Sequence, residues 1–520
     1  MQNFIFTRAG IRWFGRVVLV CLLLSSGLLM AQTRTEVKNS GKEFTYKSFD
    51  NFTSYEISKK GEVEITPDER SVKSISPGGY LYISKTTFGN KRAVKIDSDR
   101  DGKLSFQYFE GKSKEPFQGE GEAFLADVML DVIRKTGIGA ARRVERIYRE
   151  KGVAGVLDEV AEIDGSGVKN DYLDLLLQQK GLTGAELIKI AARIEKEISS
   201  SSAKGRLLAE NAGSFLRADK VAQAFFEAVG SISSSSETGD ALRQIIREER
   251  MSDPAKISLL KAAEDISSSS EKGSVLKEFH RIFTNNPKVA GQYFEVVNSI
   301  SSSSEHGSVL RELVREKNLS PINWQAFMAS ARQISSSSET GAVLRQAIDA
   351  SFPDNSQVMD NFFEVVDNIS SSSEQGAVLR KFLSTKEVSP GTAARLFVSV
   401  VKISSSSEQG SILREGVGML GKQSATDKAF FDAAAKLSSS SEKGAVLRHA
   451  LASNNLSREG LMLLLQTVKT LSSSHEAAQL LVKVAPKLDR NDQQMLEEFT
   501  EAAKSITSDS EYRRVMEAIY

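Results

Sequence analysis

Seven basic residues recur at one position of a repeated sequence, and together they could recognise acidic groups on a partner. Each follows a leucine, and neighbours in the set are 34 or 35 residues apart. They are Arg243, Lys277, Arg311, Arg345, Arg380, Arg414 and Arg448. Stacked repeats would bring these side chains together as a basic ladder. Two interpretations stay open: each residue pairs with a glutamate of its own or the adjacent repeat, or the ladder binds an acidic partner surface.

A run of serines behind an apolar residue marks each repeat. The apolar anchors that precede four serines are Ile198, Ile232, Ile266, Ile300, Ile334, Ile369, Ile403 and Leu437. Ser302 and Glu305 have the spacing of a capping box, in which the serine oxygen accepts an N–H of the first helical turn and the carboxylate reaches back to the cap. Helix N-termini can also hold anions, but the glutamates oppose this, so capping is the favoured interpretation.

A glycine recurs two residues after the capping glutamate, inside the first turn of the expected helix. These glycines are Gly239, Gly273, Gly307, Gly341, Gly376, Gly410 and Gly444, with Gly205 in the first full repeat. Glycine costs about 1 kcal/mol relative to alanine in a helix. Its repetition therefore predicts that a neighbouring backbone passes too close for a Cβ, at a tight helix crossing.

An acidic loop is the one candidate metal site in the sequence. Asp97, Asp99 and Asp101 match positions 1, 3 and 5 of an EF-hand loop, and Gly102 matches position 6. Position 12 is Tyr108 instead of the bidentate glutamate, and the flanking segments alternate like strands. A hairpin turn is therefore favoured over a weak calcium site.

The sequence contains no recognisable catalytic motif. The four histidines fall in different repeats without metal-ligand spacing; they are His280, His306, His449 and His475. His475-Glu476 does not continue as a zinc-protease H-E-x-x-H helix. A nucleophile elbow and a phosphate-binding glycine loop are also absent from the sequence. We therefore expect no enzyme activity, no catalytic residues and no cofactor.

The period of the repeat indicates which elements position these residues. About 34 residues fit two antiparallel helices joined by short connections. Asp253-Pro254, Ser320-Pro321 and Ser389-Pro390 each supply a cap followed by proline at the first helical position. Residues 163–520 are therefore predicted to form an α-solenoid of about ten helical hairpins, each burying its apolar faces against its neighbours.

The segment before the array has a different pattern. Residues 32–118 contain short alternating stretches such as Tyr80–Ile83 and Leu104–Tyr108, separated by turn signals, which predict a small antiparallel β domain of five or six strands. From Gly119 the apolar period becomes helical, which predicts a helical bridge over residues 119–162. The predicted fold class is thus mostly α, with the α-solenoid preceded by the β domain.

Residues 1–31 have the pattern of a signal peptide. Arg8, Arg12 and Arg16 precede an apolar run over residues 17–31, which is shorter than the ~20 residues that span a bilayer. Cleavage is favoured over retention as a membrane anchor. The only cysteine, Cys21, lacks the small residues expected before a lipidated cysteine. The mature chain, exported to the periplasm or secreted, would have neither disulfide nor thiol.

The composition is typical of a globular protein. The chain has 520 residues, of which 40% are hydrophobic and 26% charged, which argues against wholesale disorder and against a polytopic membrane protein. Lys and Arg number 68 and Asp and Glu 67, so the net charge of +1 gives no reason to expect a nucleic-acid partner. Membrane contact is expected only through an uncleaved leader.

Three segments resemble a known family. The stretch over residues 72–81 (VKSISPGGYL), the stretch over residues 134–140 (RKTGIGA) and the I-S-S-S-S-E repeats are similar to the region downstream of the peptidase domain in bacterial membrane metallopeptidases related to β-lactam sensors. The membrane helices and zinc motif of those peptidases are absent from this sequence. The resemblance implies an envelope module with no catalytic residues to transfer.

The sequence thus predicts a non-enzymatic exported scaffold whose repeats present a surface to a protein or peptide partner in the cell envelope. An alternative, suggested by the resemblance alone, is a sensor or regulatory accessory of a membrane signalling protein. An unrecognised hydrolase is a remote alternative.

Overall fold

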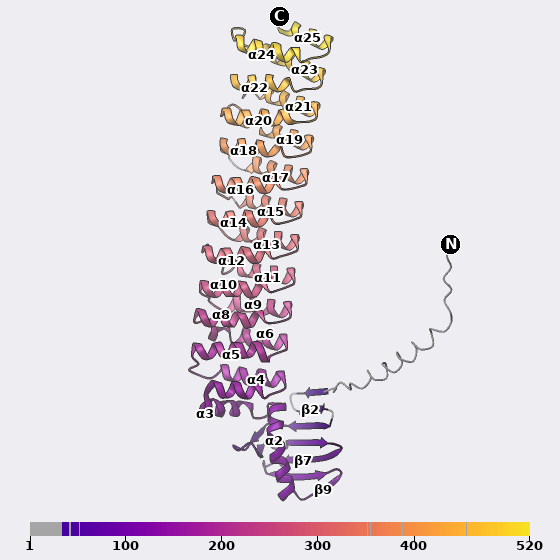
Figure 1. The fold of residues 1–520 in the computed structure, drawn as a ribbon, viewed down its shortest axis with the longest axis vertical. Helices are drawn as coiled ribbons and strands as arrows, with labels where there is room; N and C mark the ends of the chain where they lie inside the picture. The colour runs from indigo at the N-terminus through magenta and orange to yellow at the C-terminus, as the bar shows by residue number, and fades with distance from the viewer. Residues whose placement is uncertain are drawn as a thin grey trace, which may run out of the picture. The chain divides into compact units, whose positions relative to one another are not determined.

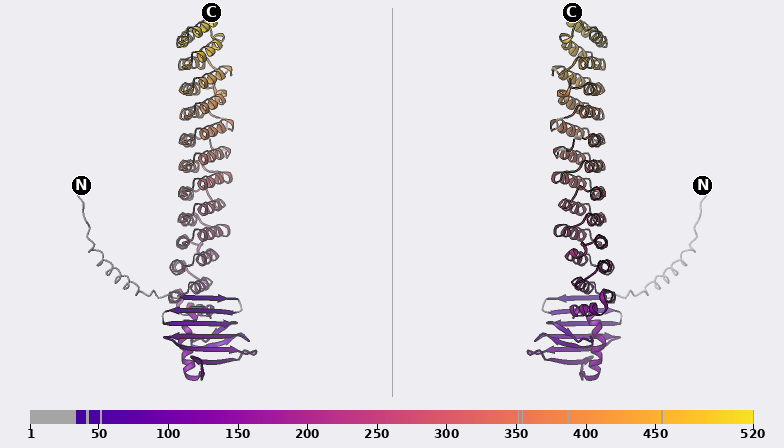
Figure 2. Two further views of the ribbon diagram at one scale, coloured as in Figure 1. Left: turned by 90° about the vertical axis from the view of Figure 1, so that its right-hand side faces the viewer. Right: turned by 90° about the vertical axis from the view of Figure 1, so that its left-hand side faces the viewer.

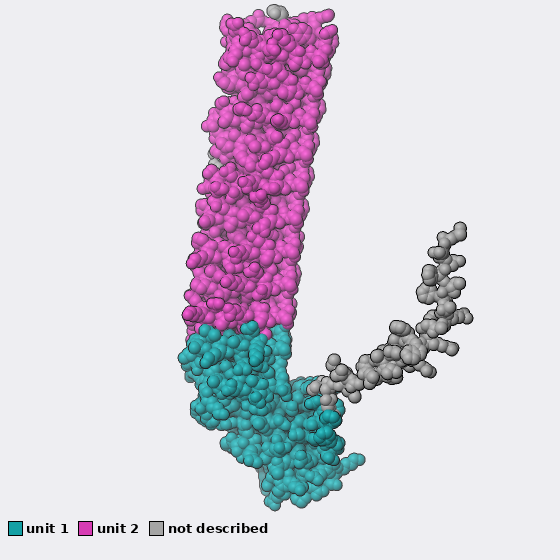
Figure 3. Space-filling view, in the orientation of Figure 1, with its two compact units in different colours: residues 1–203 teal, residues 204–520 magenta. Residues whose placement is uncertain are grey.

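The computed structural model describes residues 34–40, 43–50, 52–350, 352–353, 355–385, 388–453 and 455–519. The chain divides into two compact units, residues 1–203 and residues 204–520, which Figure 3 shows in different colours. The point of division lies inside helix α6 (Ser201–Glu210). The predicted leader, with Cys21, lies outside the described residues. None of the described helices is both long and apolar enough to cross a membrane.

Unit 1 begins with an antiparallel sheet in the order β1-β2-β3-β6-β7-β8-β9. These strands are β1 (Arg34–Asn39), β2 (Glu43–Asp50), β3 (Thr53–Lys60), β6 (Tyr80–Thr87), β7 (Asn90–Ser98), β8 (Leu104–Glu110) and β9 (Ser113–Glu115). A separate hairpin is formed by β4 (Val63–Ile65) and β5 (Val72–Ile75). The antiparallel β domain is confirmed, but the predicted number of five or six strands was too low. Two short strands form their own hairpin, and the polar strands β1 and β9 carry no apolar alternation that would indicate a strand.

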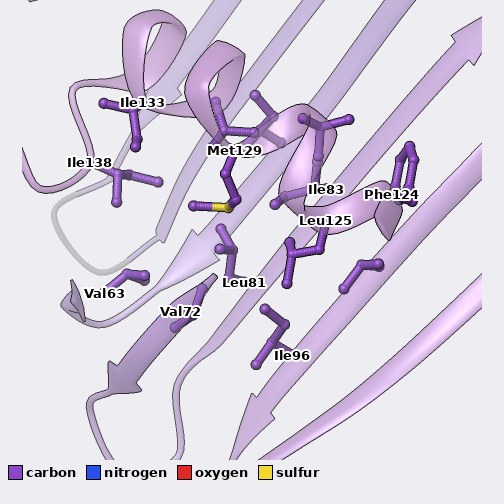
Figure 4. Packing of buried hydrophobic residues seen from close by; sticks show 14 of the residues in the cluster. Val63, Val72, Leu81, Ile83, Ile96, Phe124, Leu125, Met129, Ile133 and Ile138 are labelled. Carbon is purple, nitrogen blue, oxygen red and sulfur yellow. The ribbon is translucent and has the colours of Figure 1, made fainter. Parts of the chain in front are cut away.

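Helix α2 (Glu122–Thr136) packs on one face of this sheet and supplies a third of the buried core residues. Figure 4 shows Leu125 and Met129 of α2 facing Leu81, Ile83 and Ile96 of the central strands. These side chains are almost completely buried. Phe117, just before α2, also packs against this core.

Three further helices complete unit 1: α3 (Ala140–Ala161), α4 (Ser166–Leu177) and α5 (Gly184–Glu197). The sequence indicates two helical stretches where α3 runs. The structure joins them through Gly152, whose φ of 66° lies in the left-handed region that favours glycine. This glycine explains why the helical period changes phase within α3.

Unit 2 is an array of helical hairpins. The first helices of the hairpins, named A helices, are α8 (Asp219–Gly230), α10 (Asp253–Glu264), α12 (Pro287–Asn298), α14 (Pro321–Ala331), α16 (Ser356–Asp367), α18 (Pro390–Val400), α20 (Ser424–Lys436), α22 (Arg458–Val468) and α24 (Gln493–Lys504). The second, named B helices, are α9 (Ser235–Glu248), α11 (Ser269–Phe279), α13 (Ser303–Glu316), α15 (Ser337–Asp349), α17 (Ser372–Thr385), α19 (Ser406–Gly416), α21 (Ser440–Ala452), α23 (Ser474–Val484) and α25 (Asp509–Ile519).

The A helices pack against one another in one layer, and the B helices form the second layer. Figure 1 shows the A helices on the left of the array and the B helices on the right, and Figure 2 shows the regular stacking from two further sides. The predicted α-solenoid is confirmed. All the serine-tract anchors are buried, and the leucines that precede the basic ladder, such as Leu310 and Leu344, have no exposed surface.

A polar cap precedes each described A helix that contains proline near its start: asparagine (Asn286) in α12 and serine in α10, α14 and α18. Ser320 and Ser389 cap α14 and α18, with proline at the first helical position, as predicted. In α10 the cap is Ser252, and Asp253 is already the first helical residue. The prediction of Asp253 as the cap was therefore wrong by one residue, because proline is tolerated throughout the first turn, where N–H groups have no intrahelical partner.

Candidate partner-binding surface

The basic ladder forms ion pairs that join each repeat to the next. Arg311 Nη1 donates to Oε2 of Glu339 over 2.6 Å, and Lys277 Nζ donates to Oε1 of Glu305 over 2.7 Å. The complete set is Arg243–Glu271, Lys277–Glu305, Arg311–Glu339, Arg345–Glu374, Arg380–Glu408, Arg414–Glu442 and Arg448–Glu476. Of the two interpretations, the pairing between adjacent repeats is therefore observed. Its acceptor is always the glutamate that follows the serine tract.

The recurring glycines make room for these ion pairs. A Cβ added to Gly307 would lie 2.8 Å from Oε2 of Glu339 and 3.2 Å from Nη1 of Arg311. A Cβ on Gly239 would lie 2.7 Å from Oε2 of Glu271. The glycine prediction was therefore right about close approach and wrong about its cause, because the approaching group is a side chain of the next repeat and not a backbone.

The repeat that contains α6 supports this explanation, because it lacks the ladder. Four residues after Gly205 the chain has Ala209 where the later repeats have arginine or lysine. A Cβ on Gly205 would make ordinary contacts of 3.5 to 3.9 Å, with the backbone oxygen of Glu237 and the side chains of Ile232 and Ala241. The tight approach thus occurs where a basic residue and the next glutamate meet over the glycine.

Each serine of the tract has a separate role. Ser302 caps α13, since its Oγ accepts the N–H of Glu305 over 3.4 Å. Ser303 hydrogen-bonds Ser335 of the next tract over 2.8 Å. The same bond recurs as Ser235–Ser267, Ser269–Ser301, Ser337–Ser370, Ser372–Ser404, Ser406–Ser438, Ser440–Ser472 and Ser474–Thr507. The tract therefore caps a helix and also bonds neighbouring repeats.

The capping-box prediction was half right. The serine caps are present, but the glutamate carboxylates are held by the basic residue of the preceding repeat. Within the described residues, a complete capping box with both bonds is found at Thr183 and Glu186, at the start of α5. A glutamate at this position can accept a hydrogen bond either from its own cap residue or from a basic side chain of the preceding repeat. Where the preceding repeat has the basic residue, the glutamate forms the ion pair.

The residue before each glycine is polar and buried, a feature that sequence reasoning missed. These residues are Lys204, Thr238, Lys272, His306, Thr340, Gln375, Gln409 and Lys443. Gln375 Nε2 donates to the carbonyl oxygen of Val366 over 3.1 Å, and His306 Nε2 contacts Ser330 Oγ at 2.9 Å. Burial lowers the pKa of Lys272 and of Lys443. Each side chain thus satisfies a polar group at the end of an A helix.

The exposed surface of the A helices has a second period, of two repeats, which sequence reasoning also missed. Five residues before each anchor, an exposed position carries an acid in alternate repeats: Glu227, Glu295, Glu364, Asp432 and Glu501. The intervening repeats carry Lys261, Ala329, Val398 and Gln466. Four of these five A helices, all but α24, also contain an edge-on pair of adjacent aromatic residues, such as Phe362 and Phe363 at 5.3 Å. Comparing repeats at twice the period would have revealed both patterns.

Comparisons with known proteins identify no family for this chain. No family model matches it, and a search of curated proteins gives no match. Among solved structures, a chain of the Chs5-Bch1 exomer cargo adaptor complex is aligned over 86% of this chain and 84% of its own length, with 9% identity and a TM-score of 0.16. A circular tandem repeat protein is aligned over 77% and 80%, with 12% identity and a TM-score of 0.14. The resemblance to β-lactam-sensor-type peptidases stays a prediction.

The acidic loop forms the turn between β7 and β8. Asp99 Oδ1 accepts the backbone N–H groups of Asp101 and Lys103 over 2.9 and 2.8 Å, and Asp97 pairs with Lys95 over 2.8 Å. No group of three or more His, Cys, Asp or Glu side chains that could hold a metal lies within the described part of the chain. The predicted hairpin turn is present, and Asp99 stabilises it.

A hollow of about 1080 Å³ in unit 1 gathers several charged groups. It is lined by the β4–β5 hairpin and the start of α3, including Glu64, Glu69, Arg142 and Arg146. Glu64 pairs with Arg142 and with Lys73, and hydrogen bonds from Lys73 and Ser74 lower its pKa to about 2. A carboxylate held ionised in this way is not a general acid at neutral pH.

The histidines are separated in space as well as in sequence. His280 is buried against Tyr293, with Nε2 2.7 Å from the hydroxyl, and burial lowers its pKa to about 3. Burial lowers the pKa of His306 to about 4. His475 lies near the C-terminal end and contacts Glu511. Trp324 packs against Phe327 and Phe352, as expected for a core residue.

Proposed function

We propose that this protein is a non-enzymatic, exported scaffold that binds a protein or peptide partner along the exposed surface of its A helices. The observation that supports this most is the contrast between the two layers. Exposed positions of the A helices change from repeat to repeat, whereas the B helices repeat the same serines, glycines and ion pairs. A surface that recognises one partner needs a different chemistry at each place along it.

The B-layer features already have a structural explanation. Each ladder base is bonded to a glutamate of the next repeat, and each serine tract is bonded to the next tract. The side chains of the ladder arginines are one-sixth to one-third exposed. Recruiting them for an acidic partner would therefore require breaking bonds that join the repeats, which makes the ladder the less suitable of the two surfaces.

The A helices also carry the exposed large apolar side chains of unit 2. Within its described residues these are Ile322 on α14, Val398 on α18 and Val401 directly after α18. Glu295 and Glu364 lie at the position of Val398 in alternate repeats. A partner with apolar anchors flanked by basic residues would complement this arrangement. Such a partner could be a membrane signalling protein, in which case the scaffold would act as its regulatory accessory.

Two variants of the chain from residue 32 onward distinguish the surfaces. The A-surface variant combines Glu295→Lys, Glu364→Lys and Val398→Ser. The ladder variant combines Arg311→Gln, Arg345→Gln and Arg380→Gln. Quantitative capture from envelope extract should lose the partner with the A-surface variant and keep it with the ladder variant, provided that both melt as folded proteins. Loss with the ladder variant alone would contradict the proposal and favour the ladder as the binding surface.

A further inference from the structure

Two phenylalanines at neighbouring hairpin tips of unit 1 are the most exposed large apolar side chains of the described residues. Phe52 is 64% exposed and Phe88 is 74% exposed. Their rings stack with centroids 5.1 Å apart, and the N–H of Phe88 donates to the carbonyl oxygen of Phe52 over 2.9 Å. Phe49, on the same hairpin as Phe52, is 55% exposed. An apolar cluster held open to solvent in this way marks an interaction site.

The turn that carries Phe88 does not require phenylalanine. Thr87 pairs with Asn90, so Phe88 and Gly89 form a two-residue hairpin loop, with φ of 49° and 83°. A loop in which both residues have positive φ favours asparagine followed by glycine. Phenylalanine at its first position is disfavoured by the backbone, so the ring serves something other than the turn.

The same end of the sheet is rich in basic residues. Exposed basic side chains on the adjoining strand ends and hairpins are Arg34, Lys91, Arg92, Lys112 and Lys114. The exposed acids of these same strand ends are Asp50 and Glu110, with Glu115 next to Lys114 on β9. Apolar rings with a surrounding excess of lysine and arginine suit the interface of an anionic lipid bilayer, where rings enter the acyl boundary and cations meet phosphate groups.

The position of the chain's apolar leader agrees with this. The run over residues 17–31 ends three residues before Arg34, and Arg34 pairs with Phe49 in the sheet. A leader held in the membrane would therefore be joined to the sheet through Arg34, at the end that carries the phenylalanines. Two separate features of unit 1 thus lead to the same surface.

We propose that the β2–β3 and β6–β7 hairpin tips bind the surface of an anionic lipid membrane by inserting Phe52 and Phe88 into its interface. The lipids recognised are those with a negatively charged phosphate headgroup. This gives the chain a membrane contact of its own, beyond the leader, and does not depend on the partner proposed for the A helices.

Sedimentation with vesicles tests the proposal with the chain from residue 32 onward. The wild type should bind vesicles of phosphatidylglycerol and phosphatidylcholine and should bind pure phosphatidylcholine much less. The variant with Phe52→Ser and Phe88→Asn should lose at least about tenfold in affinity for the anionic vesicles. Its melting temperature should not fall, since asparagine suits the turn. Ile322→Ser removes an apolar side chain of unit 2 that is 57% exposed, and it should leave vesicle binding unchanged.

A spectroscopic variant tests insertion directly. With the leader removed, the chain has one tryptophan, the buried Trp324. Phe88→Trp should therefore add an emission that brominated lipids quench in anionic vesicles. The proposal is overturned if the wild type fails to bind anionic vesicles, if the double variant binds them equally well, or if the new tryptophan is not quenched. Binding of a protein through these rings, without lipid binding, would also overturn it.

Discussion

Arg311 and Glu339 meet directly above Gly307, although they belong to consecutive repeats. Nη1 of Arg311 is 2.6 Å from Oε2 of Glu339, 28 residues later in the chain. Both side chains are about 30% exposed, so the pair is partly shielded from water. An isolated exposed ion pair contributes about 0–1 kcal/mol to folding stability. Here seven pairs lie in register, so each interface between the repeats they join is stabilised by one of them.

A double-mutant cycle tests the link between the glycine and the ion pair. Gly307→Ala alone should be neutral or destabilising, because its methyl group displaces the carboxylate of Glu339. In a Glu339→Ala background the same change should stabilise the protein by about 0.5–1 kcal/mol, the helix preference of alanine. Urea unfolding of the four proteins should therefore show a coupling near 1 kcal/mol. Additive effects within about 0.3 kcal/mol would exclude the packing of Glu339 over Gly307.

Replacing the serines of one tract by alanine should destabilise α13 to different extents. Ser302→Ala removes the cap and should cost about 1 kcal/mol. Ser303→Ala removes the bond to Ser335 and should cost about 0.5–1 kcal/mol. Ser304 is exposed, so Ser304→Ala should stay within about 0.5 kcal/mol. Amide hydrogen exchange of α13 measures the effect of all three substitutions. If Ser302→Ala and Ser304→Ala reduced the protection of these amides equally, the separate roles of the serines would be refuted.

His306 predicts a pH dependence in the acid range. Its pKa is lowered by burial to about 4, below the 6.5 of an exposed histidine, so between these values the unfolded chain takes up a proton and the folded chain does not. The stabilising contribution of neutral, buried His306 is therefore present above pH 6.5. As the pH falls to 4 this contribution is lost, which lowers the free energy of unfolding by about 3 kcal/mol. His306→Gln, which introduces the residue found at the same position in two other repeats, should flatten the slope of unfolding free energy against pH over this range. The exposed His449→Gln serves as the control, and an equal flattening there would contradict the assignment.

The repeat architecture could be read from the sequence because the 34-residue period and the apolar anchors are local signals. Ile300 and Leu310 have the burial that their spacing predicts. The role of Glu305 could not be read, because a carboxylate three residues after a capping serine can reach either its own cap or a base in the preceding repeat. Only the stacking distance between repeats decides between these two partners.

The glycine position shows the same limit. A missing Cβ indicates close approach, but the sequence does not tell which group approaches Gly307. Sequence comparison missed the alternation of Glu295, Ala329, Glu364 and Val398 for another reason. A pattern that repeats every second unit is not visible when each repeat is compared only with the next one. The exposed pair of Phe52 and Phe88 is separated by more than thirty residues, and only the strand pairing brings the two rings together.

Site-specific photo-crosslinking tests the central claim, that the partner binds the A helices, most directly. A photoreactive phenylalanine derivative replaces either Ala329 on the exposed surface of α14 or Ala342 on α15, in the B layer of the same hairpin. Both sites are alanines in one repeat, Ala329 exposed in the A layer and Ala342 half-buried in the B layer. The account predicts that the probe at position 329 crosslinks the partner in envelope extract and the probe at position 342 does not. Crosslinking from position 342 alone would contradict it.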